Sequence, residues 1–342
     1  MDVKEEKTAF VYFKVLKDRY DVSVRVNGDS KVVTLNLYGR GDFLKHAKDI
    51  FLKRFHHFAI HVVCNKSINT WFFYELEKII KTSKRLKSVS LLRFYADGSY
   101  FATMFLETAG INPATKTLRV KAPQAFVTID ELLSFNALAT STTLKTLDIS
   151  ESSISDANLK NLLNVLTHNN RSVENLSVSE NMLTDTLAEH VWCLLRVNPV
   201  IRSLRMEKTF ISTQWARRII KTIGTYDRLR EFYISGNTDC VESLVDLVTR
   251  VKNLKRLSVS GMLETERNCD DFTETLKTSN RSVTTLICTQ DQFTNPSLRN
   301  ILENKRLKRV YLPALALSLV NINNLRRVNE NGRIVFLGDQ QP

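Results

Sequence analysis

Three similar stretches follow one another in this chain: LKTLDISES (144–152), VENLSVSEN (173–181) and IRSLRMEKT (201–209). Each has an apolar residue at its first, fourth and sixth places; in the first stretch these are Leu144, Leu147 and Ile149. Apolar residues two positions apart are typical of a strand with one buried face. The pattern therefore predicts a short strand in each stretch.

The same spacing recurs along most of the chain. With Val, Ile, Phe, Met or Cys accepted beside Leu, clear copies begin at Leu86, Leu144, Val173, Ile201, Leu229, Leu254, Val283 and Leu307, and degenerate copies at His57 and Thr115. Successive starts lie 24 to 29 residues apart. A period of this length indicates an array of repeats in which each unit packs against its neighbours.

A helical pattern follows the strand-like stretches. After Ile149, Ser155 can cap a helix in which Leu159, Leu162 and Leu163 recur at spacings of three and four. A capping box at 128–131 predicts another helix. Each repeat should thus contain a strand and a helix, with the strands in one parallel sheet and the helices covering one side of it.

This long unit resembles the ribonuclease-inhibitor-like class of leucine-rich repeats, over about residues 57–337. The resemblance implies an α/β solenoid of about ten repeats, shaped like a horseshoe, with strands on the concave face and helices on the convex face. It also implies an Asn eight positions after the first Leu, bonded to the neighbouring loop. Asn65, Asn181 and Asn237 match, Ser152, Thr209 and Asp291 substitute, and Phe94, Pro123, Met262 and Leu315 do not match.

The two ends differ from the repeats. Strand-like alternation covers 9–16, 22–26 and 32–37, a turn is expected at 27–29, and an amphipathic helix at 43–51. We therefore expect an N-terminal cap over 1–56, with a degenerate repeat starting at Val32. The solenoid would cover 57–337, with its last strand at 334–337, and a short tail would follow at 338–342.

The composition and charge of the chain argue against membrane, disulfide-rich, metal-binding and enzymatic proteins. The net charge of +13 is spread evenly along the chain, and no apolar leader or membrane span is evident. Five widely spaced cysteines favour neither disulfides nor a zinc site, so we expect an intracellular protein, cytoplasmic or nuclear, away from membranes. His56, His57 and His61 cluster without an evident acidic or thiol partner. We expect no catalytic residues, no metal site, no cofactor and no enzymatic activity.

The candidate binding surface follows from the repeat geometry, because residues between the buried strand places point out of the concave face. Ser and Thr dominate these places, which strand propensity and solubility alone could explain. The strongest anchors expected for a partner are Arg205, Glu231, Tyr233, Arg256, Arg309 and Tyr311. Replacing Tyr233 and Arg256 with Ala should weaken partner capture without changing the melting temperature.

A basic residue recurs at the second place of the repeats. The column consists of Lys87, Lys116, Lys145, Arg202, Arg230, Lys255 and Lys308, interrupted by Glu174 and Thr284. It could attract an acidic partner or a phosphate backbone. It could also only complement nearby helix C-termini, where basic side chains are favoured.

We interpret the chain as an interaction protein that binds another protein, as scaffold, adaptor or recognition subunit. Nucleic-acid binding along the basic column is an alternative, which a steep salt dependence of affinity would reveal. A GTPase-activating role would resemble the Ran regulators of this repeat class, but no loop Arg can be matched to theirs. The sequence specifies neither the partner nor the oligomeric state.

Overall fold

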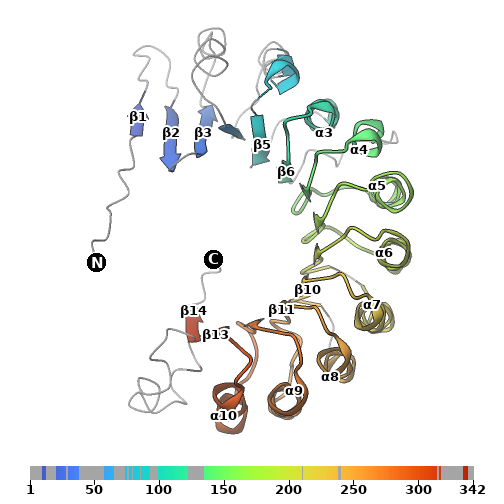
Figure 1. The fold of residues 1–342 in the computed structure, drawn as a ribbon, viewed down its shortest axis with the longest axis vertical. Helices are drawn as coiled ribbons and strands as arrows, with labels where there is room; N and C mark the ends of the chain where they lie inside the picture. The colour runs from blue at the N-terminus through green and yellow to red at the C-terminus, as the bar shows by residue number, and fades with distance from the viewer. Residues whose placement is uncertain are drawn as a thin grey trace. The chain divides into compact units, whose positions relative to one another are not determined.

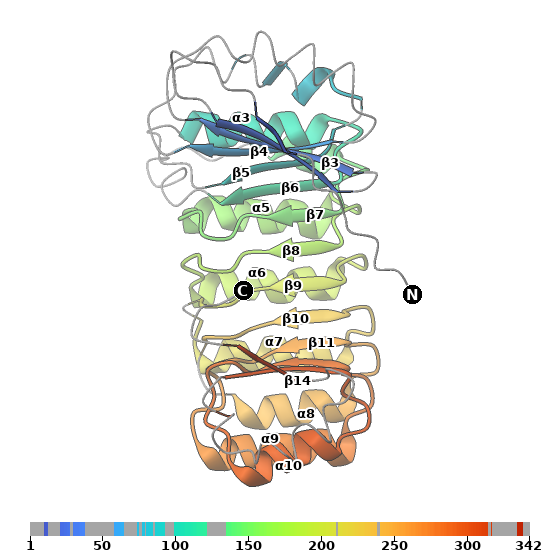
Figure 2. The same ribbon diagram turned by 90° about the vertical axis from the view of Figure 1, so that its left-hand side faces the viewer.

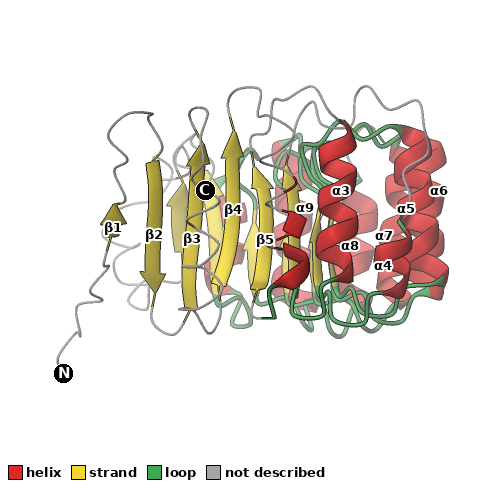
Figure 3. Ribbon diagram, turned by 90° about the horizontal axis from the view of Figure 1, so that it is seen from above, coloured by secondary structure: helices red, strands yellow, loops and turns green. Residues whose placement is uncertain are grey.

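The computed structural model of the chain describes residues 10–12, 21–27, 30–37, 58–64, 74, 77–78, 80–84, 86–92, 99–121, 135–209, 211–237, 240–313, 316 and 334–337. The chain divides into two compact units, Met1–Asn181 and Met182–Pro342. From residue 86 to residue 313, strands and helices alternate along the chain (Figure 1), and within each unit they form separate layers (Figure 3).

The first unit begins with a hairpin and continues as repeats. Its elements are β1 (Phe10–Tyr12), β2 (Asp21–Asn27), β3 (Ser30–Leu37), β4 (Phe58–Cys64), β5 (Leu86–Leu92), α3 (Ser99–Ile111), β6 (Thr117–Lys121), α4 (Asn136–Thr140), β7 (Thr146–Asp148), α5 (Asp156–His168) and β8 (Asn175–Ser177). Pairing is antiparallel from β1 to β3 and parallel from β3 to β8. The antiparallel pairing of β2 and β3 agrees with the predicted hairpin, whose turn residues 28 and 29 lie outside the described residues.

The second unit consists of repeats throughout its described part. Its elements are α6 (Asp185–Val197), β9 (Ser203–Arg205), α7 (Thr213–Thr225), β10 (Glu231–Tyr233), α8 (Val241–Arg250), β11 (Arg256–Ser258), α9 (Glu266–Ser279), β12 (Thr285–Ile287), α10 (Asn295–Glu303), β13 (Arg309–Pro313) and β14 (Ile334–Leu337). All neighbouring strands from β9 to β14 pair in parallel, and Figure 2 shows β9, β10 and β11 stacked in chain order.

Strand register agrees with the repeat starts read from the sequence. Leu118 pairs with Leu147, and Leu147 with Leu176, so the fourth places of successive repeats lie side by side. One start was misplaced. Because Val33 pairs with Ile60, the repeat in β3 begins at Ser30 rather than Val32. Both Val32 and Val33 fit a strand, and only the neighbouring strand decides which of them aligns with Ile60.

The apolar places form the core, as the repeat pattern predicts. Leu144, Leu147 and Ile149 are at most 1% exposed, and Leu159, Leu162 and Leu163 from α5 are fully buried. The predicted cap also forms, since Ser155 Oγ accepts a hydrogen bond from Asn158 N at 3.4 Å. These contacts confirm a leucine-rich-repeat solenoid. The predicted helix at 43–51, the capping box at 128–131 and the tail at 338–342 lie outside the described residues.

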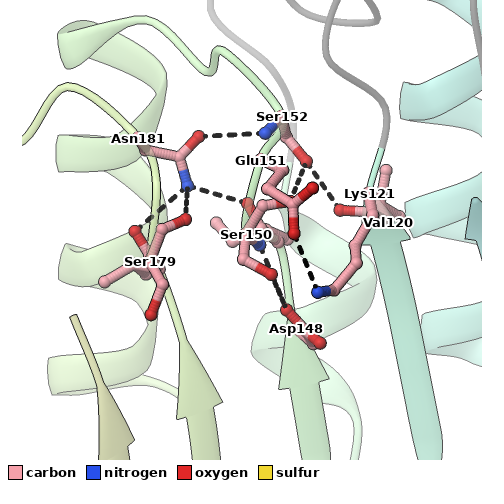
Figure 4. Close-up of polar contacts among 10 residues, drawn as sticks. Val120, Lys121, Asp148, Ser150, Glu151, Ser152, Ser179 and Asn181 are labelled. Carbon is pink, nitrogen blue, oxygen red and sulfur yellow. Dashed lines mark hydrogen bonds and ion pairs between the residues drawn. The ribbon is translucent and has the colours of Figure 1, made fainter. Parts of the chain in front are cut away.

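The asparagine ladder expected from the resemblance is present at Asn181 and Asn237, while Asn65 lies outside the described residues. Asn181 Nδ2 donates to Ile149 O at 2.8 Å and to Val178 O at 3.1 Å, and its Oδ1 accepts from Ser152 N at 3.2 Å (Figure 4). Ser152 replaces Asn in the previous repeat and donates to Val120 O at 2.6 Å. The backbone turns through a positive φ just before Ser152, Asn181, Thr209 and Asn237, for example 56° at Glu180. The ladder thus joins successive turns after the strands.

A second asparagine row lies three positions before the repeat starts, which the sequence reading missed. Asn170 Nδ2 donates to Leu138 O at 2.6 Å, and Asn304 Nδ2 donates to Leu276 O at 2.5 Å. Both asparagines are buried. The signal was present in the sequence, where Asn112, Asn170, Asn198, Asn280 and Asn304 share this place. Asn170 and Asn304 thus bond carbonyl groups in the last turns of helices from the preceding repeats, where backbone partners run out.

Candidate partner-binding surface

Four of the predicted anchors form one cluster on the strand face of the second unit. Tyr233 pairs with Arg205 across β9 and β10, and Glu231 pairs with Arg256 across β10 and β11. Since paired residues of parallel strands lie about 4.8 Å apart, their side chains can contact one another. We call Arg205, Glu231, Tyr233 and Arg256 the Arg–Tyr cluster.

The cluster is held by stacking and charged hydrogen bonds. The Arg205 Cζ atom lies 4.0 Å from the centre of the Tyr233 ring, a cation–π distance. Arg256 NH1 donates to the Tyr233 hydroxyl at 3.1 Å and lies 3.5 Å from Glu231 Oε1. The Tyr233 hydroxyl in turn donates to Glu231 Oε2 at 3.4 Å. Both arginines therefore have defined positions before any partner binds.

Tyr233 differs from the predicted exposed anchor, because its side chain is only 4% exposed. Burial raises the pKa of its hydroxyl, and the hydrogen bond to Tyr233 raises the pKa of the Arg256 guanidinium. Arg205 is exposed and Arg256 is half-buried. A partner would thus meet the two guanidinium groups, while Tyr233 supports them from below.

Arg309 and Tyr311 lie on β13, apart from the cluster. β12 separates them from Arg256, since Thr285 pairs with both Arg256 and Arg309. Arg309 is exposed, and Tyr311 is half-buried. Two strand spacings, about 10 Å, therefore separate the Arg256 and Arg309 backbones. The six predicted anchors form two groups rather than one.

The Ser and Thr residues between the apolar strand positions of the second unit form hydrogen bonds mainly with one another. The Ser235 and Ser258 hydroxyls are 2.6 Å apart, Ser235 Oγ accepts from Ser260 N at 3.0 Å, and Ser260 Oγ accepts from Thr289 N at 2.8 Å. Ser258 also donates to Glu207 Oε1 at 3.4 Å. The three serines are buried, so this row stabilises the sheet more than it offers contacts to a partner.

Glu207 also lies on the strand face of the second unit, although the sequence did not mark it as an anchor. Burial raises the pKa of its carboxyl, and the neighbouring Arg205 and the Ser258 hydrogen bond oppose that shift. Glu207 occupies the seventh position of its repeat, where four other repeats have Ser. An acidic residue at this position was the feature of the sequence that could have singled out Glu207.

The basic column forms a row within each unit. Lys116 N donates to Lys87 O and Lys145 N to Lys116 O; in the second unit, Arg230 N donates to Arg202 O and Lys255 N to Arg230 O, while Thr284 connects Lys255 to Lys308. In the first unit, Lys145 pairs with Glu174 at 2.8 Å. Arg230, Lys255 and Lys308 form no ion pair within the part of the chain that the structure describes.

We also searched the described residues for a metal site, a membrane-spanning helix and reactive cysteines. Among the described residues, no three His, Cys, Asp or Glu side chains are grouped as a metal site would require, and His56 and His57 lie outside them. The described helices include none with the length and apolar character needed to span a bilayer. Within the described ranges, Cys193, Cys240, Cys269 and Cys288 form no disulfide, and burial raises the pKa of Cys269 to about 12.

Comparison with known proteins supports the fold. No family model matches the sequence, and no curated protein matches it. A chain of the yeast complex of Rad7 and Elc1 is similar in structure, with a TM-score of 0.52 and 15% identity, over 87% of this chain and 82% of that one. The leucine-rich-repeat protein LegL7 of Legionella pneumophila gives a TM-score of 0.49 and 14% identity, over 90% of this chain and 91% of its own. At such identities the likeness concerns the fold alone.

Proposed function

We propose that this chain is a protein-interaction module that binds another protein on the strand face of its second unit. The observation that carries the proposal is the Arg–Tyr cluster, in which Tyr233 and Glu231 hold two arginines in place. Arg and Tyr are enriched at the energetic centres of interfaces. Because their arginine side chains are already ordered, binding would cost less conformational entropy.

The charges around the cluster favour an acidic partner surface. Basic side chains at the strand and rim places of the second unit are Arg202, Arg205, Arg230, Lys255, Arg256, Lys308 and Arg309. At the same places, within 201–313, the acidic residues are Glu207 and Glu231. Such an excess steers a partner of opposite charge during association.

Replacing Arg205 and Arg256 together with Ala is expected to weaken capture of the partner about tenfold or more, since charged hydrogen bonds contribute about 1.5–3 kcal/mol each. Tyr233 should be changed to Phe, because Ala at a 4% exposed site would leave a cavity. The partner would first be captured from the native source with the wild-type chain, identified by mass spectrometry and then titrated as a purified protein.

The matched control is Arg250→Ala, on α8, where Arg250 pairs with Asp246 at 2.5 Å on an exposed helix surface. Capture should be unchanged in this variant. Equal loss in the two variants would contradict a site on the strand face.

Nucleic acid is a second candidate partner, and it would bind the basic column. Within this column, Arg230, Lys255 and Lys308 lack ion pairs with the described residues. Neutralising a phosphate backbone makes affinity fall steeply with salt. We expect partner capture to survive nuclease treatment and to weaken only moderately with salt. Loss of capture after nuclease treatment would favour nucleic acid over protein.

A further inference from the structure

Two tryptophans and two arginines form a stack on helices α6 and α7. The Arg196 Cζ atom lies 4.7 Å from the centre of the Trp192 ring, and the Arg218 Cζ atom lies 4.1 Å from that ring. Arg218 also lies 4.7 Å from the Trp215 ring. The Arg218 guanidinium thus joins an indole of each helix. We call these four residues the Arg–Trp stack.

Helical spacing explains how the stack forms. Trp192 and Arg196 are four residues apart on α6, and Trp215 and Arg218 are three apart on α7, so each pair shares one helix surface. The two tryptophans are half-buried and the two arginines are exposed. The stack therefore lies at the surface of the helix layer, which the function proposed above does not use.

The two arginines of the stack are not neutralised within the described residues. Neither Arg196 nor Arg218 forms an ion pair with any described carboxylate, whereas Arg217, the residue next to Arg218, pairs with Glu242 at 3.9 Å. Stacking holds a guanidinium plane by its face and leaves its edge, which carries the N–H donors, for hydrogen bonding. A carboxylate matches that edge in charge and geometry.

We propose that the Arg–Trp stack is a second interaction surface, which binds an acidic segment of another protein. Trp and Arg dominate the energetic centres of interfaces, and the cation–π contacts already restrict the long arginine side chains. A nucleic-acid base would need an uncovered indole face, but the Trp192 ring already carries two guanidinium groups. Carboxylates need only the guanidinium edges, so the geometry favours an acidic peptide.

The experiment titrates the full chain with a Glu-rich synthetic peptide and records tryptophan fluorescence, because Trp192 and Trp215 contact the arginines that the peptide would bind. We expect a saturable change in emission, which the corresponding Gln-rich peptide does not produce. In Arg218→Gln the affinity should fall about tenfold, and Arg218→Lys should restore it only in part, because Lys cannot form bidentate hydrogen bonds.

Two controls separate this surface from the strand face and from general charge effects. Arg217→Gln removes the same charge from the adjacent residue and should change the affinity less than twofold. Arg256→Gln alters the strand face and should leave the fluorescence titration unchanged. Should Arg218→Gln lower the melting temperature, Arg196→Gln takes its place, with the same loss of affinity expected.

Three results would overturn the proposal: no emission change with the Glu-rich peptide, equal losses in Arg217→Gln and Arg218→Gln, or a single-stranded oligonucleotide that saturates the signal at lower concentration than the peptide. The first would leave the Arg–Trp stack a packing contact between α6 and α7. The strand-face proposal depends on other residues and would survive each of these results.

Discussion

Replacing Asp291 with Asn is expected to stabilise the chain at neutral and alkaline pH and to remove a pH dependence of stability. Asp291 occupies the ladder place that Asn237 fills two repeats earlier, and it is only 6% exposed. Its Oδ1 accepts from Leu263 N at 3.0 Å, while its buried Oδ2 has no hydrogen-bond partner among the described residues. Burial raises the pKa of this carboxyl from 3.8 to about 7, against backbone hydrogen bonds that lower it.

The direction of the effect follows from the raised pKa. The folded chain holds the Asp291 proton more tightly than the unfolded chain, so protonation stabilises the fold. This contribution is complete below about pH 4 and is lost as the pH rises to about 7. The difference between the pKa of 3.8 and the raised pKa of about 7 corresponds to about 4 kcal/mol of stability, at about 1.4 kcal/mol per pH unit. Asn stays neutral and could donate, as Asn237 Nδ2 does to Met206 O at 2.9 Å.

Denaturant unfolding at a series of pH values measures this effect as the difference between wild type and Asp291→Asn. The difference should be largest above pH 7 and should shrink towards pH 4. Asp271→Asn is the control, since Asp271 is an exposed carboxylate on α9 that pairs with Arg267 at 3.8 Å. A constant difference across the range would show that Asp291 does not titrate with a raised pKa.

Asn237→Ala is expected to destabilise the chain by about 2–4 kcal/mol. Asn237 Nδ2 donates to Met206 O at 2.9 Å and to Ile234 O at 2.7 Å, and its Oδ1 accepts from Thr209 N at 3.1 Å. Ala would leave these buried backbone groups without their side-chain partner. Each unsatisfied buried group costs about 1–3 kcal/mol, reduced where the site can admit water.

The matched control is Asn253→Ala, because Asn253 Nδ2 also donates to a carbonyl, Asp227 O at 2.7 Å, but at an exposed site. Water can replace that bond, so we expect a loss of about 0.5 kcal/mol or less. Denaturant unfolding of both variants at one pH gives the comparison. Similar losses in the two variants would mean that the ladder contributes no more than a surface hydrogen bond.

In the Arg–Tyr cluster, the sequence predicted the strand positions of the residues but not their side-chain contacts. The repeat register placed Arg205, Tyr233 and Arg256 on neighbouring strands, and the structure brings them together. The sequence did not show that Arg205 covers the Tyr233 ring, which leaves Tyr233 buried. That outcome depends on side chains 28 positions apart in the sequence, whose rotamers are set by contacts across strands.

The sequence by itself determined the repeat, because apolar residues at fixed local spacings can be buried only if strands and helices alternate and neighbouring units pack. Tertiary structure alone decided the start of the β3 repeat, the partners of the Arg–Tyr cluster and the joining of Trp192 to Trp215 through Arg218. Local spacing sets which face a residue occupies. Which side chain it meets there depends on the neighbouring repeat, which begins 24 to 29 positions away in the sequence.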